Sequence, residues 1–206
     1  MSEQQPGKTR SRVTLFILIG VFAAPIIGAY LAHKYKALQP VESKSFGEII
    51  SPAKALPRFK LTTGNGEAFG FDDIRQKWAY IYVIDSLCDE ACKLSLLKMR
   101  NARLGQGAEA RRVRYYLVVN QKPDDLSVFA ELVKEHPKLT FLYGSDAELK
   151  SIYDTFRDDD ERAVVNARRV YLIDPAGNYM MYYNDGFESI GIMEDLKHLL
   201  KWSQIG

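Results

Sequence analysis

The sequence predicts an α/β domain with a central mixed sheet, preceded by one apolar segment near the amino terminus. Apolar runs typical of buried strands alternate with segments of helical spacing, which favours parallel strands covered by helices on both faces. Before this domain, residues 13–32 contain no charged side chain. The only two cysteines, Cys88 and Cys92, follow a predicted buried strand and open a predicted helix. Thiol pairs at such positions often carry redox or soft-metal chemistry.

Residues 13–32 (VTLFILIGVFAAPIIGAYLA) are expected to form a retained transmembrane helix. At about 1.5 Å per residue they span about 30 Å, the thickness of a bilayer's hydrocarbon core. A cleavable signal peptide has a shorter apolar region that ends in a small-residue site. The basic cluster in residues 1–12 favours a cytoplasmic tail there. We therefore expect a single-pass protein of the inner (cell) membrane, with its soluble domain on the periplasmic side, where disulfides can form.

The remainder of the chain is long enough for one domain with its own core. Without the charges of residues 1–12, it has 25 basic and 25 acidic residues. No long basic tract remains, so nucleic acid is not expected as a partner. Residues 33–57 contain three prolines and few large apolar side chains, and they are predicted to be a linker. The folded domain is then expected to cover residues 58–206.

The elements of this domain follow in order along the chain. Residues 58–63 alternate like a strand, and Gly64-Asn-Gly66 turns them into a second strand at 67–71. Leu94 and Leu97 share one side of the helix predicted after the first cysteine. The further predicted elements are a strand at 80–84, a helix at 89–104, a strand at 114–119, a helix at 124–136, a strand at 139–143, a helix opened by the capping box Ser145-Asp-Ala-Glu148, strands at 169–174 and 179–183 around the turn 175–178, and an amphipathic helix at 190–202. This order predicts a thioredoxin-like architecture with an N-terminal β-hairpin.

Five short segments, within residues 56–202, carry a resemblance to a known family. They are Phe59-Lys-Leu-Thr-Thr63, Lys77-Trp78, Cys88-x-x-x-Cys92, Phe141-Leu-Tyr-Gly-Ser145 and Val170-Tyr-Leu-Ile-Asp-Pro-x-Gly177. In order and spacing they resemble the Sco (SenC) family of thioredoxin-like cytochrome c oxidase assembly proteins. The resemblance implies a membrane anchor, copper bound by the two cysteines and one histidine, and a cytochrome c oxidase subunit or assembly factor as partner.

This chain has only some of the residues that bind copper in that family. The family's histidine position corresponds to Asn166, and the three histidines of the chain, His33, His136 and His198, lie elsewhere. Asp89 and Lys93 stand where the family has prolines beside the cysteines. The chain is therefore identified as a divergent member that lacks the ligand histidine. Copper is the one candidate cofactor, with Cys88 and Cys92 as its candidate metal ligands and the third ligand unknown.

Two further segments are candidate ligands or contact surfaces. Met180 and Met181 could donate a thioether to copper, although methionines on a strand are more often core residues. The run Arg157-Asp-Asp-Asp-Glu-Arg162 is either a solvated acidic loop or a contact surface for a basic patch on a partner. Arg169 stands before the late strand, where thioredoxins have a cis-proline, which argues against a general-purpose thioredoxin.

The two cysteines are the candidate catalytic residues of a thiol–disulfide oxidoreductase. A helix N-terminus lowers the pKa of a thiol at the position of Cys88, whereas the nearby carboxylates of Asp85, Asp89 and Glu90 oppose that effect. Cys88 would attack a partner's disulfide, and Cys92, one turn inside the helix, would be the less exposed resolving thiol.

Four roles for the pair remain open at this stage. The first is a thiol–disulfide reductant or dithiol holder for a partner's cysteines in oxidase assembly. The second is a Cu(I) chaperone that uses the two cysteines without the histidine. The third is a non-catalytic adaptor in the oxidase complex. The fourth is a disulfide that only staples the chain, which would contribute about 2 kcal/mol for so short a loop. Whether the chain is an enzyme stays open with them.

Overall fold

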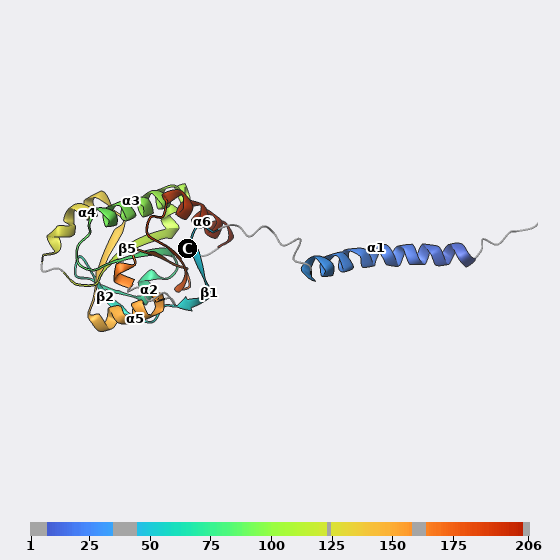
Figure 1. Ribbon diagram of the computed structural model, residues 1–206, viewed down its shortest axis with the longest axis horizontal. Helices are drawn as coiled ribbons and strands as arrows, with labels where there is room; N and C mark the ends of the chain where they lie inside the picture. Colours follow the sequence, from blue (N-terminus) through green and yellow to red (C-terminus); the bar gives the residue numbers. More distant parts are fainter. Residues whose placement is uncertain (1–7, 35–44, 123–124, 158–163, 204–206) are drawn as a thin grey trace, which may run out of the picture. The chain divides into compact units, whose positions relative to one another are not determined.

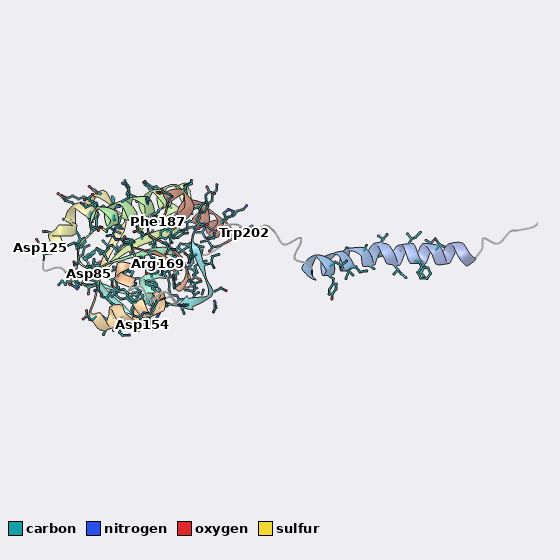
Figure 2. All side chains as sticks on the ribbon, in the orientation of Figure 1. Asp85, Asp125, Asp154, Arg169, Phe187 and Trp202 are labelled. Carbon is teal, nitrogen blue, oxygen red and sulfur yellow. A yellow bond between two sulfur atoms is a disulfide. The ribbon has the colours of Figure 1, made fainter. Side chains whose placement is uncertain are left out.

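The computed structural model describes residues 8–34, 45–122, 125–157 and 164–203. The chain divides into two compact units, Met1–Lys44 and Ser45–Gly206. In the first unit, helix α1 (Lys8–Lys34) contains the stretch Val13–Leu31, which is long and apolar enough to cross a membrane, with a mean hydropathy of 2.3. The side chains of this stretch project outward from the helix (Figure 2), and none of its residues is buried. The predicted apolar span therefore coincides with a continuous helix.

The second unit is built on a mixed β-sheet. Among the described residues the sheet has eight strands in the order β1-β8-β7-β4-β5-β6-β2-β3 (Figure 1). Strands β4, β5 and β6 are parallel, and the other pairings are antiparallel. The strands are β1 (Glu48–Ala55), β2 (Lys60–Thr63), β3 (Ala68–Gly70), β4 (Trp78–Ile84), β5 (Val113–Val119), β6 (Leu139–Tyr143), β7 (Val170–Ile173) and β8 (Asn178–Tyr183). The prediction of a mixed, thioredoxin-like sheet with an N-terminal hairpin is confirmed.

Helices cover both faces of the sheet. Figure 1 shows α3, α4 and α6 along one side and α5 along the other. Each layer encloses its own apolar cluster, one around Leu96, Met99 and Leu196 and the other around Leu149 and Phe156. The helices of this unit are α2 (Phe71–Ile74), α3 (Glu90–Leu104), α4 (Ala130–Glu135), α5 (Asp146–Phe156) and α6 (Ser189–Trp202), with short 3-10 turns η1 (Gly107–Arg112), η2 (Leu126–Phe129) and η3 (Val164–Asn166).

The central strands bring the candidate site to one edge of the sheet. All seven residues of β4 are buried, because strands on both sides and helices on both faces enclose it. The parallel register pairs Ile84 of β4 with Val119 of β5, so both strands end at the same level. Asp85, labelled in Figure 2, follows β4 and accepts a 3.1 Å hydrogen bond from the Asn120 side chain after β5. The loop that contains Cys88 starts from this edge.

Strand β1 lies within the segment predicted to be a linker. It pairs antiparallel with β8 at the edge of the sheet, and its register is irregular between Ile49 and Lys54, around Pro52. Proline is tolerated at an edge strand or bulge because no ladder hydrogen bond is needed there. The boundaries predicted for the linker, 33–57, and for the domain, 58–206, therefore need correction, because the folded unit begins at Ser45. The partner strand of β1 lies more than 120 residues further along the chain, beyond the reach of local pattern.

The exposed side of α3 carries two leucines, which is unusual for a helix side that faces solvent. The helix buries Cys92, Leu96 and Met99, whereas Leu94 and Leu97 are 52% and 41% exposed. The two leucines do share one side, as predicted, but it faces away from the core. The predicted helix 124–136 is shorter in the structure, where η2 precedes α4 and residue 124 lies outside the described residues.

Candidate functional site

Cys88 and Cys92 form a disulfide at the amino end of α3, with their Cα atoms 5.2 Å apart. Cys88 lies in the loop after β4 and is half-buried, while Cys92 lies in the first turn of the helix and is 2% exposed. The expectation that Cys92 is the less exposed of the two is confirmed. An incoming thiol or disulfide would therefore meet the sulfur of Cys88 first.

The local sequence explains why the helix begins between the two cysteines. Asp89 is the N-cap of α3, and its Oδ1 accepts a 2.8 Å hydrogen bond from the backbone N–H of Cys92. Aspartate is among the residues preferred at this position because its side chain satisfies an N–H that has no partner inside the helix. The cap holds Cys92 in helical geometry and leaves Cys88 just outside the helix.

The same carboxylate makes a second contact that the sequence did not predict. Oδ2 of Asp89 accepts a 2.8 Å charged hydrogen bond from Nη2 of Arg168. Arg168 has a φ of +48°, in the left-handed region that non-glycine residues seldom occupy. This conformation brings the segment before β7 to the amino end of α3. It also sets a positive charge among the carboxylates that surround Cys88.

Tyr82 of β4 is buried in the same apolar cluster as Cys92. Burial raises the pKa of Tyr82, and a hydrogen bond to the Ser95 side chain acts in the opposite direction. The charges of Asp185, Arg168 and Asp89 make smaller contributions to this pKa. The hydroxyl therefore stays protonated at neutral pH, so this part of the site is polar but uncharged.

Two adjoining cavities extend from Cys88 along the outer side of α3. The first, about 280 Å³, is lined by Leu87, Cys88 and Lys93 and by residues of η2 and α4, including Phe129 and Leu132. The second, about 600 Å³, lies between Leu94 and Leu97 of α3 and the carboxyl end of α4. Lys93 and Glu135 line both cavities, so the two form one groove, which we call the α3–α4 groove.

The histidines do not complete a metal site in the described structure. His136 is only 3% exposed at the end of α4, where burial and the charge of Arg100 lower its pKa. His198 lies on the exposed side of α6, and the side chains of His33 and Asn166 lie outside the described residues. The described residues contain no group of three or more His, Cys, Asp or Glu side chains able to hold a metal ion. The two sulfurs, joined in a disulfide, lack a third ligand there.

The remaining candidate ligand and contact residues either pack elsewhere in the domain or lie outside the described residues. Met181 is buried and Met180 is partly buried, and both pack against the core cluster, as expected for methionines on a strand. Arg169 is buried, and its Nε donates a 2.9 Å hydrogen bond to the side chain of Asn184. The acidic run after Arg157 falls in residues 158–163, which the structure does not describe.

Comparisons with known proteins agree with this architecture. The family described as "Transmembrane-like, thioredoxin-like, C-terminal domain" matches residues 78–203. A SCO2-like protein of Rickettsia prowazekii is 26% identical over 208 residues, covering 95% of this chain and 99% of that protein.

Solved structures support the same fold. The copper-bound ScoI of Arabidopsis thaliana is 21% identical, with a TM-score of 0.59 over 71% of this chain and 98% of that one. BsSco, described through a disulfide switch as a member of the Sco family of cytochrome c oxidase assembly proteins, is 18% identical, with a TM-score of 0.58 over 76% of this chain and 99% of that one. From its matched domain, the chain belongs to the family described as transmembrane-like and thioredoxin-like, and it is similar to Sco proteins in sequence and in fold.

Proposed function

We propose that this chain is a membrane-anchored thiol–disulfide reductant, or dithiol holder, for the cysteines of a cytochrome c oxidase subunit or assembly factor. One observation carries the proposal: a half-exposed Cys88 and a buried Cys92 form a disulfide at a capped helix start. A thiol–disulfide exchange needs this difference in exposure, since the attacking sulfur must be accessible to the partner and the resolving sulfur is shielded from it.

The reaction would run in two exchanges. The Cys88 thiolate attacks one sulfur of the partner's disulfide, so that a mixed disulfide forms and the partner's other sulfur leaves as a thiolate. The Cys92 thiolate then attacks the sulfur of Cys88, which restores the Cys88–Cys92 disulfide and releases the second partner thiolate. Two electrons pass from this chain to the partner. A further dithiol protein on the same side of the membrane would have to reduce the chain again.

Structural stapling explains the pair less well. The disulfide closes a loop with a sequence separation of only four, and short loops contribute the least stabilisation. A cap and an ion pair already hold this helix start in place. A disulfide chosen for stability would gain more from joining distant elements.

A Cu(I) chaperone is the alternative that the copper-bound ScoI of Arabidopsis thaliana brings forward. The described donor set does not complete a site for a resident copper ion, because the two sulfurs form a disulfide and the described residues contain no group of three or more His, Cys, Asp or Glu side chains able to hold a metal. Copper would be cargo for the reduced pair, with a third ligand from a partner.

The test is to trap the mixed disulfide in cells that make the full chain with Cys92→Ser. We expect a covalent adduct, reversible by reductant, whose second component is an oxidase subunit or assembly factor. The matched Cys88→Ser chain should give no adduct, although it keeps one thiol. Full oxidase assembly in cells whose only copy carries both substitutions would overturn the proposal and favour the adaptor role.

Membrane placement has a separate test. The stretch Val13–Leu31 would anchor the chain with residues 1–12 in the cytoplasm and the soluble domain in the periplasm. A reporter fused after Gly206 that is active only outside the cytoplasm should be active. Activity of a reporter that works only in the cytoplasm would contradict this orientation.

A further inference from the structure

The α3–α4 groove combines apolar side chains with a reactive sulfur at one end. Leu87, Leu94 and Leu97 are 66%, 52% and 41% exposed, and each lines the groove. The outer side of a surface helix is normally polar, so leucines there are informative when they cluster beside a cavity. Cys88 is one of the residues that line the first cavity. A segment that reached its sulfur would lie along the leucines.

The charges around the groove are uneven. Two exposed carboxylates, Glu131 and Glu135, line the cavity at Cys88, and two more, Asp89 and Glu90, directly follow Cys88 in the chain. The two cations among them, Lys93 and Arg168, are already paired at 2.8 Å with Glu90 and Asp89. The pKa of Lys93 is raised, first by its hydrogen bond to Glu90 and more weakly by Glu135 and Glu131. This end of the groove therefore retains an excess of negative charge.

The second cavity carries more positive charge. Lys93, Arg100 and Lys134 line it together with Glu90 and Glu135, and Arg100 lies beyond the two leucines along α3. An occupant with basic side chains would therefore be held with those side chains near Cys88 and not at the far end. The change of sign along the groove gives the occupant a direction.

The size of the groove limits the contact length. From Lys93 to Arg100 the helix rises about 10 Å, which matches about three residues of extended peptide. One large apolar side chain within about four residues of the reacting cysteine would reach Leu94 and Leu97.

We infer that the α3–α4 groove selects the substrate of the Cys88–Cys92 pair: a cysteine-bearing segment of a partner protein, with basic side chains beside the cysteine and one large apolar side chain within about four residues of it. This inference rests on the proposed thiol–disulfide exchange, and it names the substrate class of the same site. Leu94, Leu97, Glu131 and Glu135 would determine specificity and would take no part in bond making or breaking.

The experiment uses the reduced full chain in neutral detergent micelles. The probes are synthetic nonapeptides with one cysteine blocked as a mixed disulfide with thionitrobenzoate. Attack by the Cys88 thiolate on the peptide sulfur breaks this disulfide and releases coloured thionitrobenzoate, so absorbance gives the second-order rate constant. One peptide has two lysines beside the cysteine and a leucine three residues away. The second has glutamates for the lysines, and the third has serine for the leucine.

The first peptide should react about tenfold faster than each of the others, the size of effect expected for one buried leucine or a few favourable charge pairs. Leu94→Ser with Leu97→Ser should lower the rate for the leucine peptides about tenfold. The matched control is Leu104→Ser, since Leu104 lies on the same helix, is 51% exposed and lines neither cavity. It should leave every rate unchanged.

A second set of variants tests whether the acidic side chains cause the preference for the lysine peptide. Glu131→Gln with Glu135→Gln should remove most of the preference for the lysine peptide and flatten its dependence on salt. Glu67→Gln, at the exposed turn between β2 and β3, should change neither. Equal rates for the lysine and glutamate peptides, or equal effects of the Leu94/Leu97 and Leu104 variants, would overturn the inference.

A neutral small disulfide separates this inference from the proposed function. Bis(2-hydroxyethyl) disulfide is too small to use the groove, so its reduction reports the chemistry of the cysteines alone. We expect the reduction of this compound to depend on Cys88 and to be unchanged in the variant with Leu94→Ser and Leu97→Ser. If the wild-type chain reduced neither this compound nor any peptide, the proposed exchange itself would fail. If it reduced all of them without preference, only the groove's role would fail.

Discussion

Arg168 and Asp89 are joined by a 2.8 Å ion pair although 79 residues separate them in the sequence. The other oxygen of Asp89 caps α3 at the N–H of Cys92, so one carboxylate links the segment before β7 to the start of α3. A residue from the far half of the domain thus contacts the cap of the helix that begins between the two cysteines.

Asp89→Ala should lower the free energy of unfolding by about 1–2 kcal/mol, since it removes an N-cap and an exposed ion pair together. Asp89→Asn retains an oxygen that can cap the helix, so it should cost less than half of that. Urea unfolding of the full chain in micelles, followed by the fluorescence of the buried Trp78, would measure both. Equal losses for the two variants would mean that the ion pair, and not the cap, dominates.

Substitution of Asp195 in α6 should also lower the stability of the domain. It is 7% exposed, and its carboxylate accepts hydrogen bonds from the backbone N–H groups of Phe46 and Gly47, the hydroxyl of Ser45 and the hydroxyl of Tyr183. Asp195→Ala would leave these donors unsatisfied. A loss of about 3 kcal/mol is expected, because each buried donor without a partner costs about 1–3 kcal/mol.

The loss at Asp195 should also be local. Amide hydrogen exchange of residues 45–50 should become faster in Asp195→Ala than exchange in the central strands β4 and β5. Asp195→Asn, which keeps an acceptor but loses the charge, should show a smaller change. Unchanged exchange at residues 45–50 would contradict the role of this carboxylate in holding the start of β1.

His136 should make the stability of the domain depend on pH. Burial and Arg100 lower its pKa in the folded state, so the unfolded chain binds the proton more readily. Stability should be constant above the unfolded value of about 6.5 and should fall as the pH drops below it towards the folded pKa. His136→Gln should reduce this fall between pH 7 and 5, before most carboxylates titrate. His198→Gln, at an exposed position, is the matched control.

Copper binding by the reduced chain should be weak. Two thiolates suit Cu(I), but the described residues supply no third ligand beside them. In competition with a chromophoric Cu(I) chelator, the reduced full chain should therefore take little copper, and Cys88→Ser should take none. Tight one-to-one binding that is lost in Cys88→Ser would contradict this expectation and restore the chaperone role.

Local sequence was sufficient for most elements. The buried run of β4, the capping box of α5 and the turn between β7 and β8 each depend on residues within a few positions of one another. Gly177, for example, has a φ of +93° in the turn between β7 and β8, a backbone conformation that glycine adopts without steric cost. The cysteine pair was predictable for the same reason, since four residues across a helix start bring two sulfurs together whatever the rest of the chain does.

Three features were decided only by the tertiary structure. Strand β1 has little strand pattern of its own and forms because β8 offers an unpaired edge. Arg168 meets Asp89 because β7 lies beside β4 in the sheet. The leucines of α3 form a groove because α4 lies beside them, which no helical periodicity reveals. The sequence by itself determined the order of the elements and the position of the two cysteines at the start of α3, both of which follow from short-range geometry. What surrounds those cysteines depends on contacts between distant residues, which exist only once the sheet has brought the strands into order.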